Sequence, residues 1–424
     1  MKRTRAIGSM LPAGAAVFVV TLVVLGASCG GGSGTTIEFR RGELQGAGFA
    51  VHQPTTLAFG PDDRLYVAQL DGAIFALTLD PDSKAVTAVQ QVATDADFED
   101  VLGIAFSPVD PPDPVTLYVS TTLLNDDDDT KPYQGRVARL VGPEFTEQED
   151  IITGLPSSDH IHGTNGLAFD AEGRLYIQQG SMTNAGIAGP MGGDGDRAET
   201  PLSGATLVAD IYAPGFDGQI TYDQPNATGP TVNQTGGDVR VFASGMRNPY
   251  DIVVHSNGFI YGTDNGPNNG HDGASSDCDT VVEDPWQPDE LNLIIEGQYY
   301  GHPNRNRGRT DPRQCVYHVP EEEDGADFTK PIAILNSSSN GITEYRADAF
   351  EGALRGNLLY TWFVPGAQQG ELRRLVLSED GRAVESDETL AKGILGALDV
   401  AVGPDGTVYV AAFDGAGILF FEPM

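Results

Sequence analysis

Three stretches, LAFGPDDRLYV at residues 57–67, GLAFDAEGRLYI at 166–177 and VAVGPDGTVYV at 400–410, follow nearly the same pattern. Each has an alternating apolar segment, a turn rich in glycine, aspartate or proline, and a second apolar segment that contains a tyrosine. A period of two is typical of a β-strand, and a short turn of these residues joins two antiparallel strands. The stretches therefore predict three copies of one β-hairpin.

Looser copies extend this repeat to six. They are GIAFSP at 103–108 with LYVS at 117–120, DIVVHSNGFIY at 251–261, and GNLLY at 356–360 with LRRL at 372–375. No long segment has helical periodicity, and six repeated sheets are typical of a propeller. We therefore predict an all-β, six-bladed β-propeller, with long loops around the fourth and fifth copies. Ring closure is expected to bring the two chain ends together.

The N-terminal segment resembles a bacterial lipoprotein signal. A basic start is followed by an apolar run over residues 11–25 that is short for a membrane span, and then by small residues, Cys29 and a glycine-rich stretch. Lipidation of Cys29 would anchor the protein to the membrane through lipid only, whereas an ordinary cleaved signal peptide is the alternative. Both alternatives predict export, to the periplasm or the cell surface.

These features divide the chain into three parts. We predict a signal peptide over residues 1–28, a flexible tether over 29–45 and one propeller domain over 46–424, because no linker-like stretch interrupts the repeats.

Cysteine use and charge limit the partners. If Cys29 carries a lipid, Cys278 and Cys315 remain as one disulfide in an oxidising compartment, and two free thiols are the alternative. The formal charge of −35, from 60 acidic and 25 basic residues, argues against nucleic acid as a partner.

Three polar, glycine-rich segments lie beside predicted strands, where loops carry function. They are HIHGTNG at 160–166, GMRNPY at 245–250, and TDNGPN at 263–268, with DELN at 289–292 and GQYYGHP at 297–303 further along. Oxidation of an alcohol needs a base for the hydroxyl proton, a cation for oxyanion character and an electron acceptor, and a neutral histidine and an arginine supply the first two. No dinucleotide-binding fingerprint is present.

Together these blocks resemble the signature blocks of the glucose/sorbosone dehydrogenases, oxidoreductases that are six-bladed propellers with pyrroloquinoline quinone (PQQ) over the axis, held partly by calcium. The resemblance implies a general-base role for His162 and quinone contacts from Arg247 and Asn248. It also implies that the carbonyl groups of Gly266 and Pro267 bind calcium, and that Asp289 or Glu290 serves a second, structural calcium ion. The implied partners are a sugar substrate and an external electron acceptor.

Some positions depart from the family pattern. Gln368 and Gln369, and residues 396–398, stand where the family presents cations to the carboxylates of PQQ, and residues 98–100 offer one apolar and two acidic side chains in another loop of the cofactor site. Nearby cations that could compensate are Arg373, Arg374 and Lys392.

Two further functions therefore remain open. The first is a redox-inactive, calcium-bearing propeller that binds carbohydrate or protein. The second is a metal-dependent hydrolase with carboxylate ligands such as Asp264 and Asp399.

Overall fold

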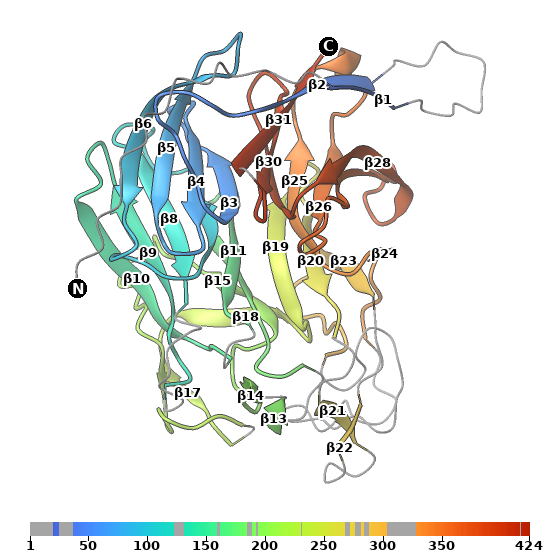
Figure 1. Cartoon of the computed structure of the whole chain (residues 1–424). Helices are drawn as coiled ribbons and strands as arrows, with labels where there is room; N and C mark the ends of the chain where they lie inside the picture. The colour runs from blue at the N-terminus through green and yellow to red at the C-terminus, as the bar shows by residue number, and fades with distance from the viewer. Residues whose placement is uncertain are drawn as a thin grey trace, which may run out of the picture.

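The computed structural model describes residues 20–24, 37–122, 131–158, 162–184, 189–191, 194–229, 231–267, 272–275, 281–283, 288–302, 328–415 and 417–424. Its strands form six antiparallel sheets of four or five strands, which follow one another around the molecule (Figure 1). The first strands of neighbouring sheets, β3, β7, β11, β19, β25 and β29, contact one another in a closed ring, in which β29 meets β3. The predicted all-β, six-bladed β-propeller is confirmed.

The first three blades run outward from the axis in chain order. Blade one contains β3 (Pro54–Phe59), β4 (Leu65–Gln69), β5 (Ile74–Leu79) and β6 (Val86–Ala93). Blade two contains β7 (Val101–Ala105), β8 (Thr116–Thr121), β9 (Gly135–Val141) and β10 (Glu147–Leu155). Blade three contains β11 (Thr164–Phe169), β12 (Leu175–Gln179), β15 (Ala205–Ala209) and β18 (Val239–Ser244).

The last three blades follow the same plan, and the sixth also uses the N-terminus. Blade four contains β19 (Asn248–Val254), β20 (Ile260–Asn265), β23 (Asp289–Ile294) and β24 (Ala333–Leu335). Blade five contains β25 (Ser339–Tyr345), β26 (Asn357–Trp362), β27 (Gly370–Leu377) and β28 (Val384–Ile394). Blade six contains β29 (Ala397–Val402), β30 (Val408–Ala412), β31 (Gly417–Pro423), β2 (Ile37–Glu43) and β1 (Val20–Val24).

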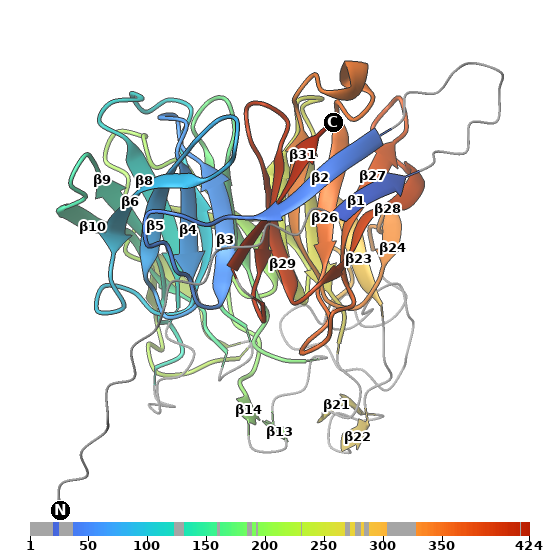
Figure 2. The same cartoon turned by 45° about the horizontal axis from the view of Figure 1, so that its top comes forward.

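Ring closure joins the two ends of the chain. Strand β2 pairs antiparallel with β31, in a register that places Phe39 opposite Pro423 and Glu43 opposite Leu419 (Figure 2). Residues 37–43, which the sequence analysis placed in the flexible tether, are thus a strand of the last blade. The alternation of buried Ile37 and Phe39 with less buried neighbours is the signal for it. Strand β1 lies within the predicted signal peptide, so signal cleavage would leave a four-stranded blade.

The six hairpin copies map onto the blades with one shift. Five copies cover the first and second strands, whereas the copy at residues 356–375 covers the second and third strands of blade five. Its true first strand, β25, carries Thr343 and Glu344 at positions that are apolar in the other blades, so the apolar pattern is missing there. The connection after β25 contains the short 3-10 helix η2 (Phe350–Gly352). Long connections follow β12, β15, β20 and β23, in blades three and four rather than four and five.

The repeated phenylalanine and tyrosine form contacts between blades. Tyr66 packs edge-on against Phe106 with ring centroids 4.9 Å apart, and Tyr118 packs in the same way against Phe169 at 4.8 Å. Such edge-to-face pairs add to the burial of apolar area. The repeat therefore encodes the packing between blades as well as each hairpin.

The long loops contain short pairs of strands. They are β13 (Gly189–Met191) with β14 (Asp194–Asp196), β16 (Thr221–Tyr222) with β17 (Gln234–Gly236), and β21 (Asp272–Ser275) with β22 (Val281–Glu283), all near one end of the propeller (Figure 1). Among the described residues, no helix is long and apolar enough to cross a membrane. The predicted lipidation site Cys29 and the predicted disulfide of Cys278 and Cys315 lie outside the described residues.

Candidate active site

The polar segments of the sequence meet at one end of the propeller. Antiparallel pairing places the start of β11 beside the end of β12, and the start of β19 beside the end of β20. The amide of Asn165 donates to Asn248 Oδ1 at 2.8 Å, and Asn248 Nδ2 donates to Asn265 Oδ1 at 3.0 Å. The structure thus brings the segments around His162, Arg247 and Asn265 together, at the end where β13, β14, β21 and β22 lie.

His162 is buried, and its surroundings select one tautomer. Its Nδ1 lies 3.1 Å from the carbonyl oxygen of Ser181, which can only accept a hydrogen bond, so Nδ1 carries the hydrogen. The Ser181 hydroxyl, 3.3 Å from Nδ1, donates to the carbonyl oxygen of Thr183 at 2.7 Å and is therefore an acceptor toward the ring. Nε2 is left as the basic nitrogen of the ring.

The backbone at Gly180 lies against His162. A Cβ atom added at Gly180 would overlap Cβ of His162 and approach Asn248 Oδ1, so only glycine fits between them. The Gly180 N–H also donates to the carbonyl oxygen of Gly163 at 2.9 Å. This close approach holds the histidine against the end of β12.

Electrostatics keep His162 neutral. Burial lowers its pKa well below the usual value, and the nearby positive charge of Arg247 lowers it further, while the hydrogen bond that His162 donates to the Ser181 carbonyl oxygen acts in the opposite direction. A neutral imidazole with an unprotonated Nε2 is the form that a general base requires.

Arg247 is only 3% exposed and is held by Asn184. Its Nε donates to the Asn184 carbonyl oxygen at 3.0 Å, and its Nη2 donates to Asn184 Oδ1 at 2.6 Å. Asp264 accepts from the backbone N–H of Arg247 at 3.2 Å and of Asn248 at 2.9 Å. Asn184 therefore orients the guanidinium group, and Asp264 fixes the backbone that carries it.

The predicted calcium ligands lie at the end of blade four. Gly266 and Pro267 are buried, and the Gly266 N–H donates to Asp289 Oδ1 at 2.9 Å. Asp289 also accepts from Asn265 Nδ2 at 2.7 Å. The carboxylate thus orders the turn that carries the two carbonyl groups.

Glu290 and Asn292 are two residues apart on β23 and are both buried. Neither polar atom of the Asn292 amide has a hydrogen-bond partner among the described residues. A buried amide without a partner is rare, and such an amide can bind a water molecule or an ion. Among the described residues, no group of three or more His, Cys, Asp or Glu side chains is arranged to hold a metal ion.

The basic residues of blade five are engaged in ion pairs on its outer strands. Arg373 lies 2.9 Å from Asp387, Arg374 lies 3.3 Å from Glu388, and Lys392 lies 3.4 Å from Glu371. Gln368 and Gln369 are exposed at the end of the same blade. The three cations are therefore committed to acidic partners of blade five.

Asp264 and Asp399, the carboxylates that a hydrolase would use, already bind backbone groups. Asp399 accepts from the Leu57 N–H at 2.6 Å and from the Val400 N–H at 2.7 Å. In the loop of residues 98–100, Phe98 packs in the core, and the guanidinium carbon of Arg136 lies 5.4 Å from the centroid of the Phe98 ring. These residues have structural roles.

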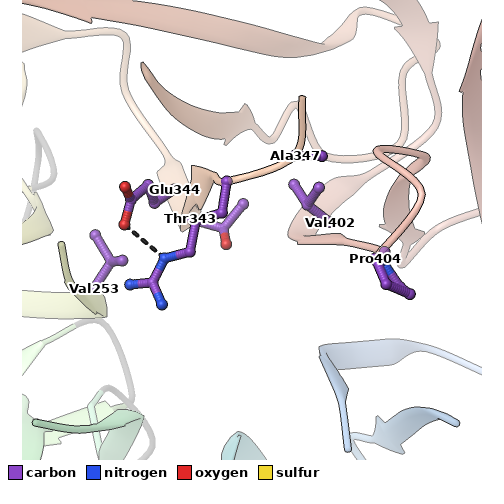
Figure 3. A pocket seen from close by; sticks show the side chains of 8 residues that line it. Val253, Thr343, Glu344, Ala347, Val402 and Pro404 are labelled. Carbon is purple, nitrogen blue, oxygen red and sulfur yellow. Dashed lines mark hydrogen bonds and ion pairs between the residues drawn. The ribbon is translucent and has the colours of Figure 1, made fainter. Parts of the chain in front are cut away.

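A pocket of about 340 Å³ lies at the turns between first and second strands (Figure 3). His162 precedes the first strand of its blade, β11, and is therefore at the opposite end of the propeller. It arises where blades five and six carry Glu344 and Val402 at the position that phenylalanine occupies in the first three blades. Glu344 accepts from Arg346 Nε at 2.7 Å and from the Ser256 N–H at 2.9 Å, and lies 3.5 Å from His255. Its charge is thus satisfied within the fold.

Sequence reasoning singled out His162, Arg247 and Asn248, but it missed Glu199. Glu199 lies in a polar loop without a motif, and His302, which pairs with it at 3.0 Å, is 103 residues away. Only the folded chain brings the two together.

Comparisons with known proteins identify relatives of this chain. The chain is 27% identical over 272 residues to quinoprotein glucose dehydrogenase B of Acinetobacter calcoaceticus, a match that covers 60% of this chain and about half, 51%, of that relative. The PQQ-bound aldose sugar dehydrogenase of Streptomyces coelicolor superposes with a TM-score of 0.56 at 20% identity, covering 88% of this chain and 95% of that one.

The apo form of the soluble aldose sugar dehydrogenase of Escherichia coli gives a TM-score of 0.61 at 19% identity, covering 88% and 97%. These structural similarities show the fold. The model of the glucose/sorbosone dehydrogenase family matches residues 51–420, and the chain belongs to that family.

Proposed function

We propose that the protein is an exported, PQQ- and calcium-dependent dehydrogenase that oxidises a hydroxyl group of an aldose or a related polyol. The observation that carries the proposal is the neutral, Nδ1-protonated His162 beside Arg247. Family membership, the name of the quinoprotein relative and the PQQ-bound structural neighbour support it.

The residues at the quinone end of the site fit the cofactor. Asn248 uses one amide hydrogen on Asn265 and has a second for a quinone oxygen, and Arg247 supplies charged N–H groups. Gly266 and Pro267 would offer carbonyl oxygens, which suit calcium. Glu290 and Asn292, whose amide has no partner among the described residues, would offer oxygen ligands to a second ion. PQQ, when bound, would supply the two-electron acceptor for a hydride from the substrate carbon.

The chain's own residues would then act as follows. His162 Nε2 takes the proton of the substrate hydroxyl, while its Nδ1–H stays on the Ser181 carbonyl oxygen and holds the ring in place. Arg247, fixed by Asn184, offsets the negative charge that develops on the reacting oxygens. Burial excludes water from the base.

A redox-inactive binding propeller is the second candidate, and one observation favours it. Arg373, Arg374 and Lys392 are paired with acidic residues of their own blade, so they do not replace the cations that the family presents to the cofactor. Buried carboxylates bind weakly without paired charge.

Titration of the purified protein with PQQ and calcium, followed by calorimetry, separates the two functions. For a dehydrogenase, we expect calcium-dependent PQQ binding and dye reduction driven by aldoses. His162→Gln should abolish the reduction, whereas His255→Gln, a buried histidine near the pocket of Figure 3, should leave it nearly unchanged. No PQQ binding at high concentration would refute the dehydrogenase and leave the binding propeller.

A further inference from the structure

The connection between β12 and β15 contains a fully buried carboxylate, Glu199, that the mechanism above does not use. Its oxygens accept from the Met182 N–H at 3.0 Å, the Thr183 N–H at 3.1 Å and the Thr183 hydroxyl at 2.6 Å. His302 Nε2 lies 3.0 Å from Oε1. Several donors therefore stabilise the buried charge, as a buried carboxylate requires.

Residues 181–184, which Glu199 holds, also contact the base and the cation. At one end, the Ser181 carbonyl oxygen accepts from His162 Nδ1 at 3.1 Å. At the other end, Asn184 accepts from Arg247 through its carbonyl oxygen at 3.0 Å and its Oδ1 at 2.6 Å. Glu199 binds Met182 and Thr183, which lie between these two ends. It therefore contacts His162 and Arg247 indirectly, through residues 181–184.

We propose that Glu199, paired with His302, is a positioning residue that fixes residues 181–184, and thereby the Nδ1–H tautomer of His162 and the orientation of Arg247. Charge-assisted hydrogen bonds from two consecutive backbone N–H groups leave this segment little freedom. The catalytic consequence rests on the proposed function, whereas the tautomer is a property of the chain alone.

Electrostatics favour a geometric role. The charge of Glu199 raises the pKa of His162 while that of His302 lowers it, so their effects on the base oppose each other. The pair therefore influences His162 through the Ser181 carbonyl more than through its net charge.

Glu199→Gln tests the proposal, since it keeps the shape but turns one acceptor oxygen into a donor that faces N–H groups. The readout is nitrogen-15 NMR of the histidine rings in cofactor-free, full-length protein, with the His162 signals assigned from His162→Gln. One net hydrogen bond favours a tautomer by up to about tenfold, so we expect the wild type to be almost wholly Nδ1–H and the variant to be a mixture.

Glu344→Gln is the matched control. Glu344 is also buried, accepts from a backbone N–H and lies near a histidine, but it lines the pocket of Figure 3. It should lower thermal stability as Glu199→Gln does and leave the His162 signals unchanged. Unchanged His162 signals in Glu199→Gln, or equal changes in both variants, would overturn the proposal.

Thr183 provides a second test if Glu199→Gln does not fold. Thr183→Val removes the hydroxyl that binds Glu199 and keeps the volume, whereas Thr183→Ser keeps the hydroxyl. A tautomer change in Thr183→Val that is absent in Thr183→Ser supports the proposal, and wild-type signals in both refute it.

Activity adds an independent readout. In the PQQ-loaded enzyme, Glu199→Gln should lower kcat about 100-fold through misplacement of the base, with a smaller change in KM. A wild type that does not bind PQQ would refute the proposed function, whereas the NMR comparison would still decide the role of Glu199.

Discussion

Replacing Phe39 by alanine removes the largest side chain that β2 contributes to the last blade. Phe39 is 2% exposed and lies in the core cluster that also contains Tyr345 and Phe421, with its ring 5.1 Å from that of Phe350. Loss of a buried phenylalanine costs the transfer free energy of the ring plus a cavity term, together about 3–5 kcal/mol. The N-terminal strand would then be held mainly by its ladder with β31 and by the ion pair between Arg40 and Glu422.

Thermal denaturation followed by circular dichroism measures the effect. For a chain of this size, we expect Tm to fall by about 5 °C, because each kcal/mol shifts the midpoint of a large domain by only one or two degrees. Glu38→Ala is the control, since Glu38 is adjacent on β2 but not part of the core. A Tm for Phe39→Ala that equals that of Glu38→Ala would show that β2 does not close the ring and that residues 37–43 belong to the tether.

Three further predictions concern the site and the axis. Because the pKa of His162 lies below its usual value, kcat/KM should fall only as the pH drops through a value under about 6.5. An inflection of the pH profile above that value would exclude His162 as the base. Gly180→Ala should lower kcat about 100-fold, since its Cβ would displace His162, and steady-state kinetics with unchanged kcat would contradict this. Burial raises the pKa of Asp399 to about 6, so the native state binds its proton more tightly than the unfolded state. The free energy of unfolding of the wild type relative to Asp399→Asn should therefore fall by about 2 kcal/mol as the pH rises from 4 to 6, and urea midpoints that show no such trend would refute it.

Local pattern was sufficient for most of the fold. Hairpins are encoded by alternation and turn residues within about a dozen positions, so five of the six copies marked the first and second strands of their blades. The copy in the fifth blade was shifted because β25 carries Thr343 and Glu344 at positions that are apolar in the other blades. Strand β2 was assigned to the tether because its partner β31 lies at the other end of the chain.

The candidate site was also predictable in part from the sequence. Short motifs indicated His162, Arg247, Asn248 and the Gly266–Pro267 turn, because each lies directly beside a strand of the repeat. The tautomer of His162 depends on the Ser181 carbonyl and the orientation of Arg247 on Asn184, contacts that no spacing predicts.

The sequence by itself determined the six blades, the family and the principal polar segments, because strand alternation, turn chemistry and contiguous motifs are local properties of a chain. Only the tertiary structure decided which strand closes the ring, that Glu199 and His302 meet behind the base, and that the cations of blade five are paired with acidic residues of the same blade. These contacts join residues that are distant along the chain or on neighbouring strands, and side-chain packing and burial, rather than residue type, select among their possible partners.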